Sequence, residues 1–415
     1  MTGMPKLERN SGADPVVGSD RITAIDVLRG LALCGILVVN IESFSMNNSA
    51  LFNPTSVGDL TGLNYWIWLA TDLLFENKFM AIFSMLFGAG VILMTTHVES
   101  RGVSPSPIHY RRMLVLLVFG LIHGYLFWDG DILVWYSMCG LLLYLFRNRS
   151  AAGLVASGLG ALAVGSALFA VFAWSMPHWP PESLAEFSKG FSPTAEEVAR
   201  DLAAYRSGWL DQIAFRAPHT LSMQTSVFFF WGIWRAGGMM LLGMGLFQLG
   251  VLSGRRSNRF YLGLFAAGLL IGLPVVGFGI LQNVRHEWAI EYSFFTGTQY
   301  NYWGSIPMCL AYAGAVMLLV NNGLAAGATS RLAAVGRMAL TNYLMQTIVC
   351  TAIFYGHGLG LYGRMERAGQ IVIVFAILSC QLILSPLWLR HFRFGPAEWL
   401  WRSLTYGKRQ RFRRT

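Results

Sequence analysis

The chain has 415 residues, of which 54% are hydrophobic and 13% are charged, and its formal net charge is +10. This proportion of charged residues is too low to cover the surface of a soluble globule of this size. The composition therefore excludes a water-soluble protein and predicts contact with a lipid bilayer. The basic residues stand mainly at the ends of apolar segments and at residues 408–414, a distribution that indicates membrane topology and argues against binding of nucleic acid.

Long apolar segments recur along the chain, and each is about as long as a bilayer is thick. They predict an all-α fold, a polytopic transmembrane bundle of about ten helices, because barrel strands would alternate apolar and polar residues instead. The second segment is longer than a bilayer requires, so its first half is expected to be an external or interfacial helix. The expected spans lie at residues 22–42, 65–96, 112–128, 132–146, 151–175, 227–251, 260–282, 303–321, 333–355 and 368–389.

The spans divide the chain into a helical half before and a helical half after one long loop. Lysine and arginine are concentrated on one side of the predicted bundle, so both termini are expected in the cytoplasm. In the loop, Thr194 followed by Glu196 and Glu197 predicts the start of a short amphipathic helix. The predicted regions are a polar cytoplasmic tail (1–21), the N-terminal half (22–175), the extracytoplasmic loop (176–225), the C-terminal half (226–390) and a basic cytoplasmic tail (391–415).

Two ionisable residues stand in the first turns of the first expected span. Because a charge at membrane depth costs about 2.5 kcal/mol or more, such residues are candidates for function. Asp26 and Arg29 are three residues apart and share one helix face, where they can neutralise each other as a structural ion pair. In the functional interpretation, Arg29 binds the anionic part of a cytoplasmic cofactor such as a pyrophosphate, which a guanidinium group suits.

A second group of ionisable residues is expected at the outer side of the bundle. His123 stands near the end of a predicted helix, and Asp129 and Asp131 follow in the next turn. An imidazole oriented by a carboxylate is the usual arrangement of a general base. In the structural interpretation, the two aspartates cap the turn and His123 is a core residue whose hydrogen bonds are satisfied.

The remaining polar residues at membrane depth have less specific meanings. Arg235 is expected to be buried among aromatic residues, where it pairs with Glu42 or with an acid near His123, or stacks on tryptophan. The five cysteines are scattered without a C-x-x-C pair, so no metal site is predicted. Four further polar residues can either join helices by hydrogen bonds or contact a substrate: Arg337, Thr341, Asn342 and Gln346.

Three separated motifs follow one another along the chain: R-I-x-x-I-D-x-L-R-G-L-A-L-x-G-I-L-x-V-N, H-G-x-L-F-W-D-G-D-I-L and G-R-M-A-L-T-N-Y-L. In this order they resemble the YeiB family of bacterial membrane proteins, and the similarity extends from about Arg21 to Gly407. The D-x-x-R-G in the first motif also resembles the opening of the transmembrane acyltransferases. These include lysosomal heparan-α-glucosaminide acetyltransferase and bacterial enzymes that O-acetylate surface glycans.

The second resemblance implies an acyltransferase of the bacterial inner membrane. Such a protein uses cytoplasmic acyl-CoA as a co-substrate, without a covalently bound cofactor, and modifies an extracytoplasmic glycan, lipid or small molecule. Carried over to this chain, Arg29 with Asp26 stands at the donor end, and His123 with Asp129 or Asp131 at the transfer end. This function requires a cavity that connects the two ends of the bundle.

Two other functions are compatible with the same residues. In a transporter or flippase, the buried ionisable residues would form a proton or ion pathway, and Arg235 would hold an anionic substrate. In a non-catalytic membrane assembly factor, replacement of His123 by alanine would alter nothing except stability.

Overall fold

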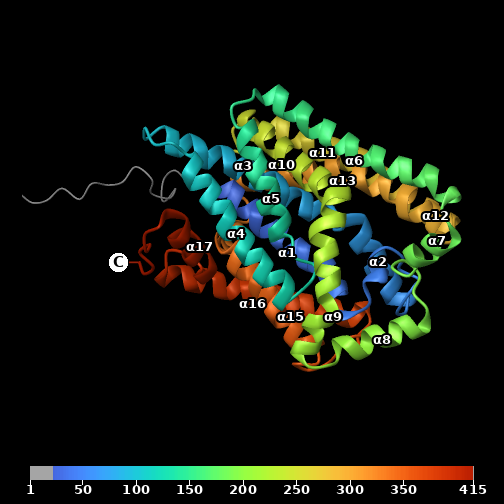
Figure 1. Cartoon of the computed structure of the whole chain (residues 1–415). Helices are drawn as coiled ribbons and strands as arrows, with labels where there is room; N and C mark the ends of the chain where they lie inside the picture. The colour runs from blue at the N-terminus through green and yellow to red at the C-terminus, as the bar shows by residue number, and fades with distance from the viewer. Residues whose placement is uncertain (1–21, 415) are drawn as a thin grey trace, which may run out of the picture.

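The computed structural model describes residues 22–414, which form an almost entirely helical protein (Figure 1). Within this range no strand is present, and the one β-bridge joins Phe392 to Arg413. Seven helical segments of the described range are long and apolar enough to cross a membrane, and shorter apolar helices accompany them. The predicted all-α polytopic transmembrane bundle is therefore confirmed, while the count of about ten spans and the cytoplasmic location of the termini stay predictions. The predicted N-terminal tail lies outside the described residues.

The N-terminal half contains six α-helices, and the second expected span is divided in two. Asn77, with a left-handed conformation at φ of 62°, directly precedes the helix that begins at Lys78, and the helix before it ends at Leu74. The predicted separation of this span is thus observed. The helices are α1 (Thr23–Ser45), α2 (Gly62–Leu74), α3 (Lys78–Glu99), α4 (Ser106–Leu126), α5 (Leu133–Leu143) and α6 (Ala151–Ser175), with short 3₁₀ turns η2 (Asn48–Leu51), η3 (Tyr144–Phe146) and η4 (Met176–His178).

The long loop is more helical than its sequence suggests. Its helices are α7 (Pro181–Ser188), α8 (Ala195–Tyr205) and α9 (Trp209–Ser222), and α9 continues through a π-helix, η5 (Met223–Gly232), into α10 (Ile233–Gln248). The capping box predicted at Thr194 is present before α8. The helical segment that includes the expected span at residues 227–251 begins earlier, at Trp209. The polar residues of α9, which resemble a loop in sequence, are buried against protein: Gln212, Arg216 and Thr220.

The C-terminal half ends in a helix rather than an extended tail. Its elements are α11 (Asn258–Arg285), α12 (Ile290–Tyr292), the π-helix η6 (Ser293–Gly297), α13 (Thr298–Asn321), α14 (Ala326–Arg337), α15 (Ala339–Phe354), α16 (Arg367–His391) and α17 (Pro396–Tyr406). The expected span at residues 333–355 is broken at Met338, between α14 and α15. The predicted basic tail therefore contains α17, which packs against α4 and α15.

The helices pack closely where glycine removes the side chain. A Cβ atom on Gly243 of α10 would lie 2.0 Å from the carbonyl oxygen of Met85 on α3, and one on Gly88 would lie 2.0 Å from the carbonyl oxygen of Met240. Such small residues let membrane helices approach each other. In Figure 1, α17 lies at one end of the molecule, while α7 and α8 lie at the other. We call these the basic end and the loop end.

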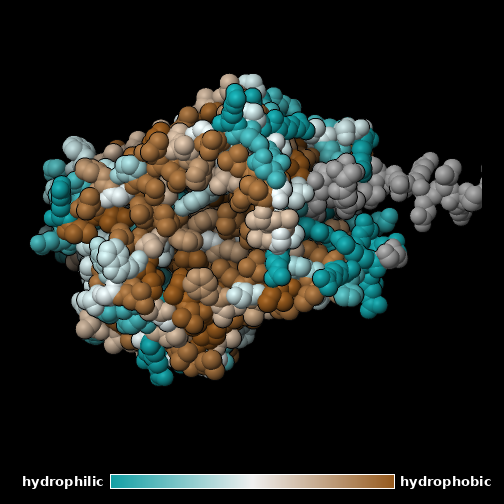
Figure 2. Space-filling view, turned by 180° about the vertical axis from the view of Figure 1, so that it is seen from behind, coloured by the Kyte–Doolittle hydropathy of each residue, from teal (hydrophilic) through white to brown (hydrophobic). Residues whose placement is uncertain are grey.

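The surface between the two ends is apolar. Figure 2 shows a broad brown area across the body of the protein, with hydrophilic residues gathered toward its ends. Trp174 of α6, Leu270 of α11 and Phe375 of α16 are 75%, 76% and 65% exposed. A water-soluble monomer rarely exposes so large an apolar surface, so this surface fits a multi-pass membrane protein.

Candidate functional site

His123 is held on both sides of its ring. It lies in the last turn of α4, where Nδ1 is 2.8 Å from Oδ1 of Asp131 and Nε2 is 2.9 Å from Oγ1 of Thr347 on α15. The other oxygen of Asp131 accepts the backbone N–H of Val134 at 2.8 Å. A carboxylate only accepts hydrogen bonds, so Nδ1 donates to Asp131 and the lone pair of Nε2 faces the hydroxyl of Thr347.

Asp129 is hydrogen-bonded to a different histidine, His219. Its Oδ2 lies 2.5 Å from Nδ1 of His219 on α9, so of the two predicted acids only Asp131 orients His123. Burial alone would raise the pKa of Asp129, but the hydrogen bond and charge of His219, together with Arg216, hold that pKa below its ordinary value. The Asp129 carboxylate is 2% exposed and the His219 side chain 48% exposed.

The sequence does not predict a role for His219, because residues 209–222 resemble a loop. The available signal was the spacing of Gln212, Arg216 and Thr220, which repeats every four residues and forms one buried polar face of α9. This face contacts the turn that carries both aspartates. Arg216 is buried and donates to the carbonyl of Phe127, and Trp209 donates to the carbonyl of Leu126 at 2.9 Å.

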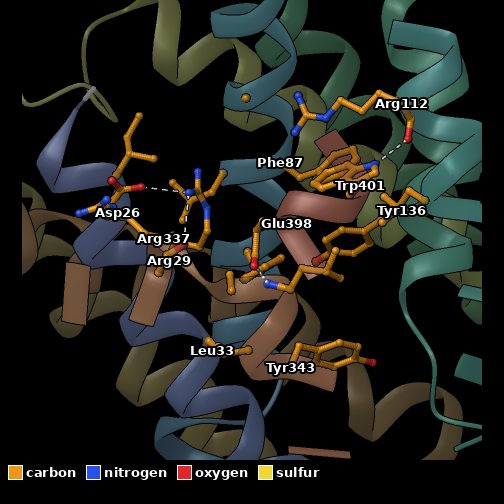
Figure 3. A pocket seen from close by; sticks show the side chains of 18 of the residues that line it. Asp26, Arg29, Leu33, Phe87, Arg112, Tyr136, Arg337, Tyr343, Glu398 and Trp401 are labelled. Atoms are coloured by element: carbon orange, nitrogen blue, oxygen red, sulfur yellow. Dashed lines mark hydrogen bonds and ion pairs between the residues drawn. The ribbon is translucent and has the colours of Figure 1, made fainter. Parts of the chain in front are cut away.

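A cavity of about 250 Å³ extends inward from the basic end (Figure 3). Its polar part carries four arginines from four helices, together with two acids: Arg29, Arg112, Arg337 and Arg402, with Asp26 and Glu398. Its apolar part is lined by α1, α3, α4 and α5: Leu33, Ile36, Leu86, Phe87, Leu116 and Leu133. The cavity thus combines a cationic region with an apolar interior.

The cavity ends beside the buried histidine. Tyr343 lines it, and the Tyr343 ring centroid lies 5.1 Å from that of His123. Ile132, which also lines the cavity, directly follows Asp131. The hydroxyl of Tyr343 is buried and donates no hydrogen bond to any of the described residues. One aromatic ring therefore separates the cavity from His123.

The predicted Asp26–Arg29 pair is present at the basic end. Arg29 Nη1 lies 3.1 Å from Oδ1 of Asp26, and both residues line the cavity. The Arg29 side chain is 27% exposed, and its Nη1 also donates to the carbonyl of Gly336 at 3.5 Å. Binding of an anion by Arg29 stays a prediction. A guanidinium group can bind phosphate oxygens through paired hydrogen bonds, so the arginines are the residues suited to an anionic co-substrate.

Arg235 and Glu42 do not form the pair considered from the sequence. Glu42 instead binds Arg367, with 2.6 Å between Oε1 and Nη2. Arg235 donates to the carbonyl of Tyr302 at 2.8 Å and to Oγ of Ser305 at 2.5 Å, and its guanidinium lies 4.7 Å from the centre of the Tyr302 ring. The hydrogen-bond acceptors of the two Arg235 Nη atoms on α13 are neutral, and they involve neither Glu42, nor an acid near His123, nor tryptophan.

Two of the later polar residues join helices. Asn342 donates to Oγ of Ser385 at 3.0 Å, and Gln346 donates to Oε1 of Gln381 at 2.9 Å, so α15 is bound to α16. Neither residue lines the cavity, whereas Arg337 does. This geometry favours the structural interpretation for Asn342 and Gln346.

Glu398 of α17 fixes the beginning of α15. Its carboxylate accepts the backbone N–H groups of Leu340 at 2.6 Å and Thr341 at 3.1 Å, and the hydroxyl of Thr341 at 2.5 Å. A carboxylate at this position satisfies amides that the helix leaves unpaired. Burial raises the pKa of Glu398. This contact between α17 and α15 is not predicted from the sequence, because it joins residues more than fifty positions apart.

Comparison with known proteins places the chain in one family. A family profile described as "Protein of unknown function (DUF418)" matches residues 246–408. The chain is 32% identical over 407 residues to "Uncharacterized protein YxaH" of Bacillus subtilis (strain 168), covering 95% of this chain and 97% of that protein. It is 31% identical over 392 residues to "Uncharacterized protein YeiB" of Escherichia coli (strain K12), covering 93% and 96%. With this identity over nearly the whole of each chain, the protein belongs to the YeiB family, as its three motifs predicted.

Proposed function

We propose that the protein is an acyltransferase of the bacterial inner membrane. It transfers an acyl group from cytoplasmic acyl-CoA to an extracytoplasmic glycan, lipid or small molecule. The observation that carries the proposal is the cavity between the arginines of the basic end and Tyr343, because the Tyr343 ring that lines it packs against the ring of His123. The basic end then faces the cytoplasm, in agreement with the positive-inside rule.

The donor would bind with its phosphates at the basic end. Arg29, Arg112, Arg337 and Arg402 offer guanidinium groups for the phosphate oxygens. The volume of about 250 Å³ lies below the range of roughly 300–1,000 Å³ that holds whole drug-sized ligands. The interior therefore suits the slender thioester arm of acyl-CoA, while the nucleotide stays at the mouth.

His123 would act as the general base in transfer. Its Nε2 accepts a proton from the attacking hydroxyl or amine, the acyl carbon forms its new bond, and the carbon–sulfur bond breaks to release the CoA thiolate. Asp131 holds the productive tautomer and stabilises the imidazolium. A thioester in the cavity must pass Tyr343 to reach Nε2, so the proposal requires the Tyr343 side chain to turn aside.

The test compares purified wild-type protein in nanodiscs with Arg29→Ala and His123→Ala, measuring acetyl-CoA binding and slow hydrolysis. We expect Arg29→Ala to weaken binding about 10-fold or more, from the loss of a charge-assisted hydrogen bond, and His123→Ala to reduce hydrolysis about 10²–10⁴-fold with binding retained. Arg259→Ala and His286→Ala replace exposed residues outside the cavity and serve as matched controls. Folded wild-type protein that neither binds nor cleaves acetyl-CoA or a longer acyl-CoA would overturn the proposal.

A transporter or flippase is the second candidate, and a separate buried polar group favours it. Lys78 is fully buried, and its Nζ donates to the carbonyl of Asp72 at 2.6 Å and to Oδ1 of Asn301 at 2.8 Å. With the Glu42–Arg367 pair, it gives the bundle ionisable groups away from the cavity. Proton-coupled uptake in proteoliposomes that is lost in Lys78→Met but unaffected by His123→Ala would favour this function.

A further inference from the structure

The hydroxyl of Thr347 completes an arrangement that general-base catalysis by His123 does not use. Oγ1 of Thr347, the His123 ring and Asp131 form a continuous hydrogen-bonded series with distances of 2.9 Å and 2.8 Å. The three residues are buried, and Thr347 is 1% exposed. A hydroxyl within 2.6–3.2 Å of an imidazole that a carboxylate orients is the geometry of an activated nucleophile.

The position of Thr347 on α15 relates this series to the cavity. Thr347 follows Tyr343 by four residues, so both lie on one face of the helix, one turn or ~5.4 Å apart along its axis. Tyr343 lines the cavity, and Thr347 lies beyond it. A thioester that displaces the Tyr343 ring would therefore reach the hydroxyl of Thr347 together with Nε2 of His123.

Two unpaired hydrogen-bond donors flank the histidine. The Tyr343 hydroxyl and Nε1 of Trp128 are buried, and neither donates a hydrogen bond to any of the described residues. Both rings pack against His123, with centroid distances of 5.1 Å and 6.3 Å. Buried donors without an acceptor are rare and energetically costly. Two of them beside one imidazole therefore indicate a site that can stabilise an oxyanion.

We propose that Thr347 is the covalent nucleophile and carries the acyl group between the two substrates. The inference rests on the proposed acyltransferase function and deepens it. Oγ1 of Thr347 attacks the thioester carbon while its proton passes to Nε2 of His123. The carbon–sulfur bond then breaks, and the CoA thiolate takes that proton and leaves as the thiol. The acceptor hydroxyl next attacks the threonine ester, gives its proton through His123 to Oγ1 of Thr347, and leaves with the acyl group.

This sequence of steps suits a protein whose substrates lie on opposite sides of a membrane. CoA leaves toward the basic end before the acceptor reacts, so the two substrates never need to meet. Nε1 of Trp128, which packs beside His123, supplies a donor for the oxyanion that forms on the acyl carbon in each step. Thr347 is a catalytic residue in this mechanism, and Asp131 is a positioning residue that acts through His123.

The experiment exposes wild-type protein in nanodiscs to acetyl-CoA without acceptor, followed by acid quenching and peptide mass spectrometry. We expect one acetyl group on Thr347, stable at neutral pH and removed by alkaline hydroxylamine, as for an oxygen ester. Thr347→Ala should abolish the adduct and slow CoA release about 10³-fold or more, while Thr347→Ser restores both. Thr351→Ala replaces another buried threonine of α15 and should leave both unchanged.

The outcomes separate this inference from the proposed function. CoA release that continues in folded Thr347→Ala, or an adduct on another residue, overturns the role of Thr347 and leaves an acyltransferase with direct transfer. Absence of both CoA release and adduct in wild-type protein overturns the proposed function and this inference together. Thermal unfolding of each variant, with rescue by serine, distinguishes loss of chemistry from loss of fold.

Discussion

The His123–Asp131 and His219–Asp129 pairs are built from aspartates two residues apart in one turn, yet their surroundings are opposite. In the first pair, both side chains are at most 2% exposed, and both ring nitrogens of the histidine are hydrogen-bonded. In the second pair, the carboxylate is equally buried, but the imidazole is 48% exposed. The buried pair is held in one orientation away from water, whereas the exposed pair faces the surroundings of the loop end.

The difference between the pairs indicates that α9 determines the conformation of the turn, and thereby which histidine each aspartate contacts. Arg216 and Trp209 hold the carbonyl groups of Phe127 and Leu126, so the turn after α4 has one conformation. In that conformation Asp131 points to α4 and Asp129 to α9. A short sequence motif therefore contributes to two sites of different character.

The largest expected effect comes from exchanging each aspartate for asparagine. Asp131→Asn should reduce acyl-CoA turnover about 10³–10⁴-fold, because an amide in place of the carboxylate favours the wrong tautomer of the buried histidine. Asp129→Asn should reduce turnover less than the ~10²-fold that loss of a general base costs, because its histidine lies outside the proposed reaction path. Steady-state CoA release in nanodiscs measures both.

A larger loss of turnover in Asp129→Asn than in Asp131→Asn would identify the His219–Asp129 pair as the catalytic one. If Asp129→Asn abolished CoA release while Asp131→Asn left it unchanged, His219 would be the base and the buried pair a structural contact. Equal loss in both variants, accompanied by lowered unfolding temperatures, would show that the whole turn is needed for folding. His286→Ala, at an exposed position, supplies the baseline.

The two pairs also differ in how well they could be predicted from the sequence. The sequence predicts His123 with Asp129 or Asp131, because ionisable residues are costly at membrane depth and therefore rare there. The choice of Asp131 comes from the structure. His219 was missed because the polar face of α9, buried against protein, resembles a solvated loop in sequence. Thr347 gave no signal, since a threonine in an apolar helix usually bonds to its own backbone.

The fold shows the same division between local and tertiary information. Apolar runs predicted the helical class and most spans, because their length reflects the bilayer itself. The partner of Arg235 could not be predicted, since carbonyl and hydroxyl acceptors on α13 serve as well as a carboxylate. The cavity was required by the proposed function but depends on how several helices pack, which no single segment encodes.

A smaller effect is expected at Glu398, which holds the beginning of α15 in place. Because α15 carries Thr347, Glu398 acts on the buried His123–Asp131 pair and not on His219. Glu398→Ala removes the acceptor for the N–H groups of Leu340 and Thr341, and should lower the free energy of unfolding by about 1–3 kcal/mol. Glu398→Gln keeps one acceptor oxygen and should cost less. Denaturant unfolding in detergent compares the two variants, and a larger loss in glutamine than in alanine would contradict this capping role.

The smallest effect is expected at Gly124, where α9 and η5 approach α4 between the two pairs. A Cβ atom there would lie 2.9 Å from Nε2 of Gln224, 3.3 Å from Cγ2 of Thr220 and 3.4 Å from Cβ of Asp131. Overpacking costs about 1–3 kcal/mol, while alanine gains up to about 1 kcal/mol over glycine in a helix. Gly124→Ala should therefore lower the free energy of unfolding by about 1 kcal/mol.

Gly277 of α11 provides the matched control, because a Cβ atom there has no neighbour within 4 Å. Gly277→Ala should keep only the helical gain, so unfolding of the two variants should differ by the overpacking cost of about 1–3 kcal/mol. Since the nearest atom to Gly124 belongs to the side-chain amide of Gln224, the additional variant Gln224→Ala should recover much of the loss. Equal stability of Gly124→Ala and Gly277→Ala would mean that α9 tolerates displacement, and that the turn alone assigns each aspartate to its histidine.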